Sequence, residues 1–143
     1  MKYIAIFAIV IIASVFAHSA FKTLEARSKP TNPVEDIVFP CERGNYSAAG
    51  RHMLYDGADA RKIGKTFDYE KDDDQARENL VNRCREFKLM GENGYKVVSL
   101  AINQEMEKPI FQYNVDVTRN GQKVREKWFF REQDGYGVLL NVE

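Results

Sequence analysis

The chain has 143 residues, and its 21 basic side chains balance 21 acidic ones, so the formal net charge is zero. That length fits one domain after a short leader, with enough chain to bury a hydrophobic core. The mixed charges exclude the basic face that nucleic-acid binding normally requires. Two cysteines cannot hold a structural zinc ion alone, and His18 and His52 are the only histidines, so the sequence indicates no metal and no cofactor.

Residues 1–20 have the features of a secretory signal peptide. Lys2 gives a positive start, an uncharged run extends to Phe21, and small residues suited to a signal peptidase lie between Ala17 and Ala20. The sequence therefore predicts an exported protein, periplasmic or extracellular, with a cleaved leader. Because the uncharged run is close to the length that spans a bilayer, a retained membrane anchor is the alternative. Membrane contact is expected only in that second case.

Residues 21–31 predict a polar spacer, and a single domain is expected over 32–143. The domain opens with NPVE at 32–35, where the Asn, Pro and Glu occupy the positions that cap and start a helix. Pro40 is expected to kink or end this helix, because its ring lacks an N–H and crowds the preceding turn. A second, short helix is predicted over 46–55.

The strongest helix signal covers residues 72–90, after a segment without clear periodicity at 58–71. Three aspartates at 72–74 suit the positive N-terminal end of a helix, and Gly91 is expected to end it. One apolar stripe runs along it, made of Ala76, Leu80, Val81, Cys84, Phe87 and Met90. This stripe predicts packing against a flat apolar surface.

The last part of the chain predicts that surface as a sheet. Four strands are expected over residues 95–103, 110–118, 123–131 and 136–142. Asn-Gly at 120–121 and Asp-Gly at 134–135 are typical of tight hairpins. In the third strand Trp128 and Phe130 share an apolar face with Glu126, and in the fourth the alternation predicts a face made of Tyr136, Val138, Leu140 and Val142.

The predicted fold class is therefore α+β, with N-terminal helices packed on a curved four-stranded antiparallel meander, cone-like in shape. Cys41 and Cys84 leave two states open. A disulfide is compatible with an exported protein, whereas free cysteines are also among the most buried residues.

Several local motifs resemble the nuclear transport factor 2-like superfamily. They are NPVE at 32–35, GNYSAA at 44–49, EKWFF at 126–130 and DGYGVLLNV at 134–142. The likeness is greatest to exported, lumazine-binding-like domains, and it spans residues 32–143. It implies a curved sheet that wraps a helix into a cone. It does not select a function, because such folds include isomerases, hydratases and binding modules.

We expect a non-catalytic binding module for a small apolar ligand or a protein partner, because the sequence has an aromatic face and few catalytic groups. Pockets are mostly apolar with few polar groups, and the candidate lining residues are Tyr55, Tyr113, Trp128 and Phe130. The oligomeric state stays open.

Two alternatives remain. A cone-fold isomerase- or hydratase-like enzyme would need a carboxylate whose pKa is raised by desolvation, and the candidates are Glu126 and Asp116. Burial of Glu126 beside a cavity of about 300 Å³ or more would favour this enzyme. A protein-interaction role would instead use an exposed sheet face bearing Phe129 and Leu139.

Overall fold

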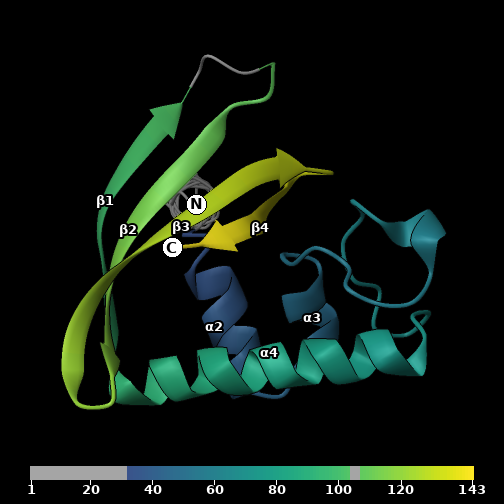
Figure 1. The fold of residues 1–143 in the computed structure, drawn as a ribbon, viewed down its shortest axis with the longest axis horizontal. Coiled ribbons are helices and arrows are strands. Elements are labelled where there is room, and N and C mark those ends of the chain that lie inside the picture. The colour runs from purple at the N-terminus through teal and green to yellow at the C-terminus, as the bar shows by residue number, and fades with distance from the viewer. Residues whose placement is uncertain (1–31, 104–106) are drawn as a thin grey trace, which may run out of the picture. The chain divides into compact units, whose positions relative to one another are not determined.

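The computed structural model describes residues 32–103 and 107–143 (Figure 1). The predicted leader and spacer, residues 1–31, lie outside these ranges. The elements are α2 (Glu35–Glu42), α3 (Tyr46–Gly50), a 3₁₀ turn η1 (Ala60–Lys62), α4 (Asp74–Asn93), β1 (Tyr95–Asn103), β2 (Ile110–Arg119), β3 (Gln122–Gln133) and β4 (Tyr136–Val142). No helix within these described ranges combines the length and apolarity needed to cross a bilayer.

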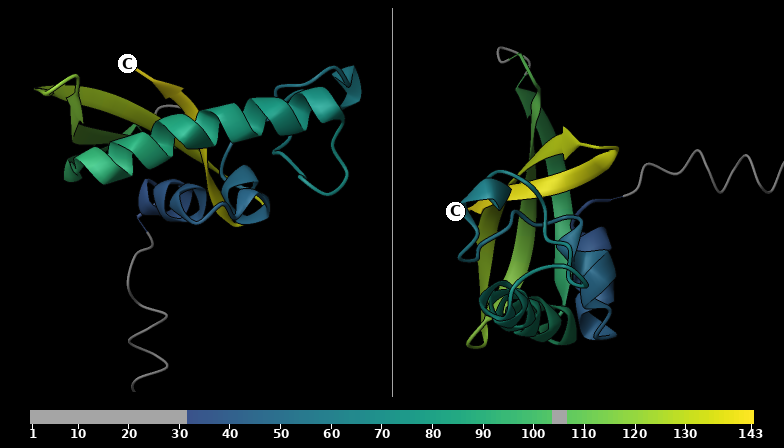
Figure 2. Two further views of the ribbon diagram at one scale, coloured as in Figure 1. Left: turned by 90° about the horizontal axis from the view of Figure 1, so that it is seen from below. Right: turned by 90° about the vertical axis from the view of Figure 1, so that its right-hand side faces the viewer.

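The α+β prediction is confirmed. The strands form an antiparallel meander in the order β1-β2-β3-β4. The sheet is curved, and α2 and α3 pack along α4 on one side of it (Figure 2). The helices thus precede the sheet in the chain and cover one of its faces.

The first two helices, α2 and α3, are short, and local contacts mark where they begin and end. Asn32 Oδ1 accepts a hydrogen bond from Val34 N at 3.1 Å, which caps the chain entering α2 as the sequence predicts. Pro40 lies inside α2 near its end. The prediction of a helix over 46–55 is wrong in length, because the chain leaves α3 to make a parallel bridge between Met53 and Leu139 of β4.

Helix α4 begins two residues later than predicted, at Asp74, and it also ends later. Asp73 is its N-cap and accepts a hydrogen bond from Ala76 N at 2.9 Å. Gly91 is not the end, because the helix continues to Asn93 and stops at Gly94, whose φ is +84°. Gly91 instead permits close helix packing, since a Cβ there would lie 2.0 Å from Glu42 Oε1 of α2.

We predict that Asp73 contributes to the acid sensitivity of the fold. The Tyr55 hydroxyl and then Ala76 N donate hydrogen bonds to this carboxylate and lower its pKa. A lowered folded-state pKa gives stability that is complete above the unfolded pKa and lost as pH falls through the folded one. Asp73→Asn keeps a capping side chain without the charge. Its urea midpoint should therefore fall less than that of the wild type between pH about 5 and about 2.

The control for this prediction is Asp74→Asn. Asp74 is exposed and pairs with Arg77 one turn further along the helix, so its loss should leave the acid dependence close to that of the wild type. Equal acid dependence of the wild type and Asp73→Asn would contradict the prediction.

Both predicted hairpins are present. Asn120 and Gly121 have φ values of +51° and +78°, and Asp134 and Gly135 have +52° and +80°. Two consecutive positive φ values are those of the tight turn that matches the twist of paired strands.

The register divides the sheet into two faces. Directly opposite residues in an antiparallel pair share a face, so the helix-facing side carries two cross-strand rows. The first row is Leu100, Tyr113, Trp128 and Val142, and the second is Ile102, Phe111, Phe130 and Leu139.

The predicted apolar face of β4 is correct only in part, for Val138, which is fully buried, and for Val142, which packs against the core. The register between β3 and β4 shifts between Phe129 and Phe130, which leaves Leu140 outside the pairing. Leu139 and Val142 therefore pack against the core. Phe129, opposite Asn141, faces away from the helices, so Phe129 and Leu139 do not share the exposed patch that the interaction alternative requires.

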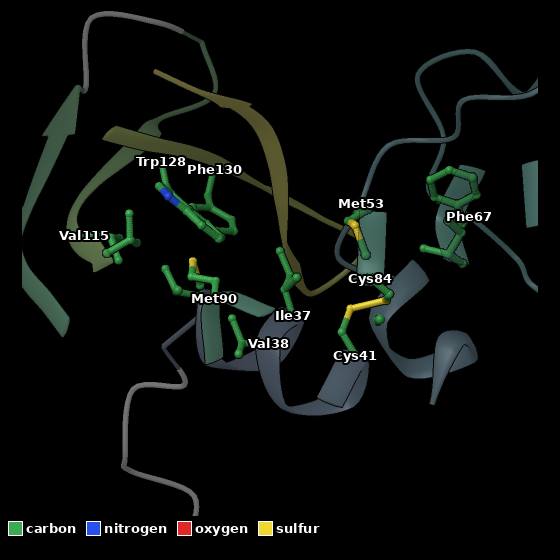
Figure 3. Close-up of a cluster of buried hydrophobic side chains, with 14 of the residues drawn as sticks. Ile37, Val38, Cys41, Met53, Phe67, Cys84, Met90, Val115, Trp128 and Phe130 are labelled. Atoms are coloured by element: carbon green, nitrogen blue, oxygen red, sulfur yellow. A yellow bond between two sulfur atoms is a disulfide. The ribbon is translucent and has the colours of Figure 1, made fainter. Parts of the chain in front are cut away.

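The core lies between the helices and β2 and β3 (Figure 3). Trp128 and Ile37 are completely buried in it. Of the two states left open for the cysteines, the structure has the disulfide: Cys41 of α2 is bonded to Cys84 of α4.

Candidate functional site

The four predicted pocket residues do not form one pocket. Trp128 and Phe130 are 0% and 1% exposed, and their rings lie 6.3 Å apart. Phe87 of α4 covers Trp128, with ring centroids 5.3 Å apart. These two aromatic side chains thus fill the core rather than line an open cavity.

Tyr55 and Tyr113 have separate surroundings. Tyr55 packs on Phe67, its hydroxyl donates to Asp73, and the same oxygen accepts from Asp59 N at 2.9 Å. Tyr113 is partly buried and meets Phe130 edge-on at 5.5 Å. Tyr113 alone of the four combines contact with the core and partial exposure.

Glu126 is buried, but both of its carboxylate oxygens are occupied. Oε1 accepts a hydrogen bond from Arg119 Nε, and Oε2 accepts one from Trp128 Nε1 at 3.0 Å. The hydrogen bond with Glu126 raises the pKa of Arg119. The carboxylate thus satisfies the buried indole N–H and pairs with an arginine at the end of β2.

Asp116 lies on the opposite side of the sheet. Its cross-strand partner is Arg125, whose Nε and Nη2 donate to the carboxylate at 2.7 and 3.1 Å. Arg125 lowers the pKa of Asp116, which is opposite to the shift expected of a carboxyl in an apolar catalytic pocket. Asp116 borders a shallow hollow of about 330 Å³, together with Lys96 and Lys123.

Among the described residues, the most exposed apolar part of the helix-facing side was not predicted from the sequence. Leu100 and Ile102 of β1 are 47% and 49% exposed, and they lie opposite Tyr113 and Phe111 of β2. Figure 1 shows the reason: the end of β1 and the start of β2 extend beyond the helices. We call these four residues the open apolar corner.

Tyr113 provides the polar group of the open apolar corner. Its hydroxyl has no hydrogen-bond partner among the residues that the structure describes. Burial, followed by the charge of Asp36 on α2, raises the pKa of Tyr113. The hydroxyl is therefore protonated at neutral pH and free to donate.

A larger cleft of about 920 Å³ lies elsewhere, between the 62–72 loop and the β3–β4 turn. Tyr69 and Tyr136 contribute aromatic surface to it. Its charges are balanced: the lining residues are Ser47, Arg51, Lys62, Lys65, Thr66, Phe67, Asp68, Tyr69, Glu70, Lys71, Asp72, Gln133, Asp134 and Tyr136. Lys62 is paired with Asp72 at 2.6 Å, so this cleft offers no clear charge preference.

Within residues 32–103 and 107–143, no His, Cys, Asp and Glu side chains gather in a group of three or more that could hold a metal ion. The clustered aspartates at 72–74 bind neighbouring protein groups. Asp72 binds Lys62 Nζ and Asp68 N, at 2.6 and 2.8 Å, and Asp73 caps α4.

No protein-family model matches the sequence, and no curated protein matches it. Among solved structures, the chain is similar to a designed nuclear transport factor 2-like protein, with 13% identity and a TM-score of 0.42. The match covers 77% of this chain and 90% of the designed one.

Proposed function

We propose that this domain is a non-catalytic binding module that holds a small apolar molecule against the open apolar corner. The observation that carries the proposal is the half-exposure of Leu100 and Ile102 beside partly buried aromatic rings. Covering one such half-exposed side chain contributes roughly 1 kcal/mol. Apolar side chains grouped in this way are typical of binding sites.

The electrostatics favour a neutral ligand. The Tyr113 hydroxyl can donate a hydrogen bond, and the carboxylate of Asp36 is near enough to act on it electrostatically. A carbonyl or similar neutral acceptor would pair with this hydroxyl. An anionic head group would be repelled by Asp36. The ligand class is therefore an apolar molecule with one neutral hydrogen-bond acceptor.

The pairing of both candidate carboxylates supports a non-catalytic role. Glu126 is bonded to Arg119 and Trp128, and Asp116 is bonded to Arg125. A general base must be free to take a proton from substrate, and neither carboxylate lies in the open apolar corner.

We further propose that the domain works outside the cytosol. Disulfides persist in oxidising compartments and are rare in the cytosol, and the Cys41–Cys84 bond agrees with the predicted signal peptide.

Fluorescence titration with Nile red, a neutral apolar dye with a carbonyl group, tests the binding proposal. Replacing Leu100 and Ile102 together by glutamine should weaken dye binding at least tenfold, because apolar contact is lost. The control is Val124→Gln, since Val124 is 44% exposed near the β2–β3 hairpin. Equal binding by the wild type and the double variant would contradict the proposal.

A second variant tests the polar group. Tyr113→Phe removes one hydroxyl and keeps the ring, so Nile red affinity should fall about fivefold, equivalent to about 1 kcal/mol. Circular dichroism should show an unchanged fold. An unchanged affinity would show that Tyr113 does not hold the ligand carbonyl.

A further inference from the structure

The sheet has one open edge in the described part of the chain. β1 pairs with β2 on one side, and no strand pairs with its other side. The opposite edge is covered at Leu139 of β4, whose N donates to His52 O at 2.8 Å and which makes a bridge with Met53. An open edge presents backbone groups that recognise another strand.

The two halves of β1 differ in how well they are protected. Charged side chains and bulges are the usual devices that prevent edge pairing. Lys96 and a bulge at Val98 occur in the first half. From Ser99 to the end of the strand there is no charge and no proline. This second half also carries the half-exposed Leu100 and Ile102.

We propose that two copies of the chain pair antiparallel through this second half of β1, around a two-fold axis at Ala101. In that register Leu100 lies opposite the partner's Ile102, and Ile102 lies opposite the partner's Leu100. Directly opposite residues share a face, so the four apolar side chains meet on the helix-facing side. An axis at Leu100 would instead draw the bulged Val98 into the pairing.

The charge pattern of β1 and the covered opposite edge of the sheet both agree with a second copy of the chain as the partner. Lys96 lies beyond the paired segment, so no like charges face one another across the axis. Since the other edge is covered by His52 and Met53, pairing closes at two copies rather than growing into a fibre. The paired segment is short, so we expect a weak dimer whose population depends on the protein concentration.

Sedimentation of the purified protein tests the proposal with Ala101→Lys. Ala101 lies on the face away from the helices, opposite Gln112. The variant places two ammonium groups across the axis and should weaken dimerisation at least tenfold. Gln112→Lys, which adds the same charge on the neighbouring strand, should dimerise like the wild type. A monomeric wild type, including one that binds an extended segment of another protein, would overturn the proposal.

Cysteine cross-linking tests the register. Mild oxidation of Ala101→Cys should give a covalent dimer, because the two sulfurs meet at the axis. Ser99→Cys should stay uncross-linked, since the two positions 99 of the dimer lie far from each other in this register. Equal cross-linking of the two variants, or none for Ala101→Cys, would overturn it. Ala101→Lys should keep Nile red binding, which separates a failure of the dimer from a failure of the proposed function.

Discussion

Removal of the Cys41–Cys84 disulfide should lower the free energy of unfolding by about 4 kcal/mol. The bond joins residues 43 apart in the sequence, and it closes a long loop in the unfolded chain. Closing that loop removes conformations from the unfolded state and so stabilises the folded one. The loss should be conspicuous, because it is a large fraction of the stability of an ordinary domain.

Urea unfolding with and without reductant measures this effect. Reductant should shift the wild-type midpoint strongly and leave the double variant Cys41→Ala, Cys84→Ala unchanged. The variant should match the reduced wild type closely, apart from a small packing loss at two buried positions, which are 3% and 1% exposed. The prediction would be contradicted if reduction lowered the free energy of unfolding by less than about 1 kcal/mol.

Glu126→Ala should destabilise the domain by about 2–3 kcal/mol, below the range for a fully buried ion pair. The change leaves Trp128 Nε1 buried without an acceptor and Arg119 without its partner. The Arg119 side chain is 48% exposed, so water compensates part of its loss.

Two variants separate this structural role from a general effect of substitution. Glu126→Gln keeps an acceptor oxygen and should recover about half of the loss in urea unfolding. Asp116→Ala breaks an exposed pair on the other face of the sheet and should cost less than about 1 kcal/mol. A Glu126→Ala protein as stable as Asp116→Ala would contradict the structural role.

The strands were predictable because local signals determine them. Residues 95–103 and 136–142 are the observed bounds of β1 and β4, since turns and helix ends mark them in the sequence. The face of β4 was only partly predictable, because alternation assumes regular pairing and the shift beside Phe130 breaks it. Similarly, Gly91 resembles a helix end locally, and only the approach of α2 explains its place inside α4.

The site was predicted less well than the fold. Trp128 and Phe130 have the composition of a pocket wall, yet Phe87 and the other core residues cover them. Leu100 and Ile102 remain half-exposed because the helices stop short of the end of β1. Such coverage depends on helix length and position, which the period of a strand does not contain. The types of residue on one face of the strands therefore predicted which surface is apolar. They did not predict which part of that surface the helices leave exposed.

Mapping of amide chemical shifts by NMR during Nile red titration tests the central claim most directly. We predict that the perturbed amides cluster at 99–102 and 111–114, accompanied by the single indole N–H of Trp128. Perturbations that cluster instead around Arg51, Lys65 and Tyr69 would place the ligand in the 920 Å³ cleft and contradict the assignment of binding to the open apolar corner.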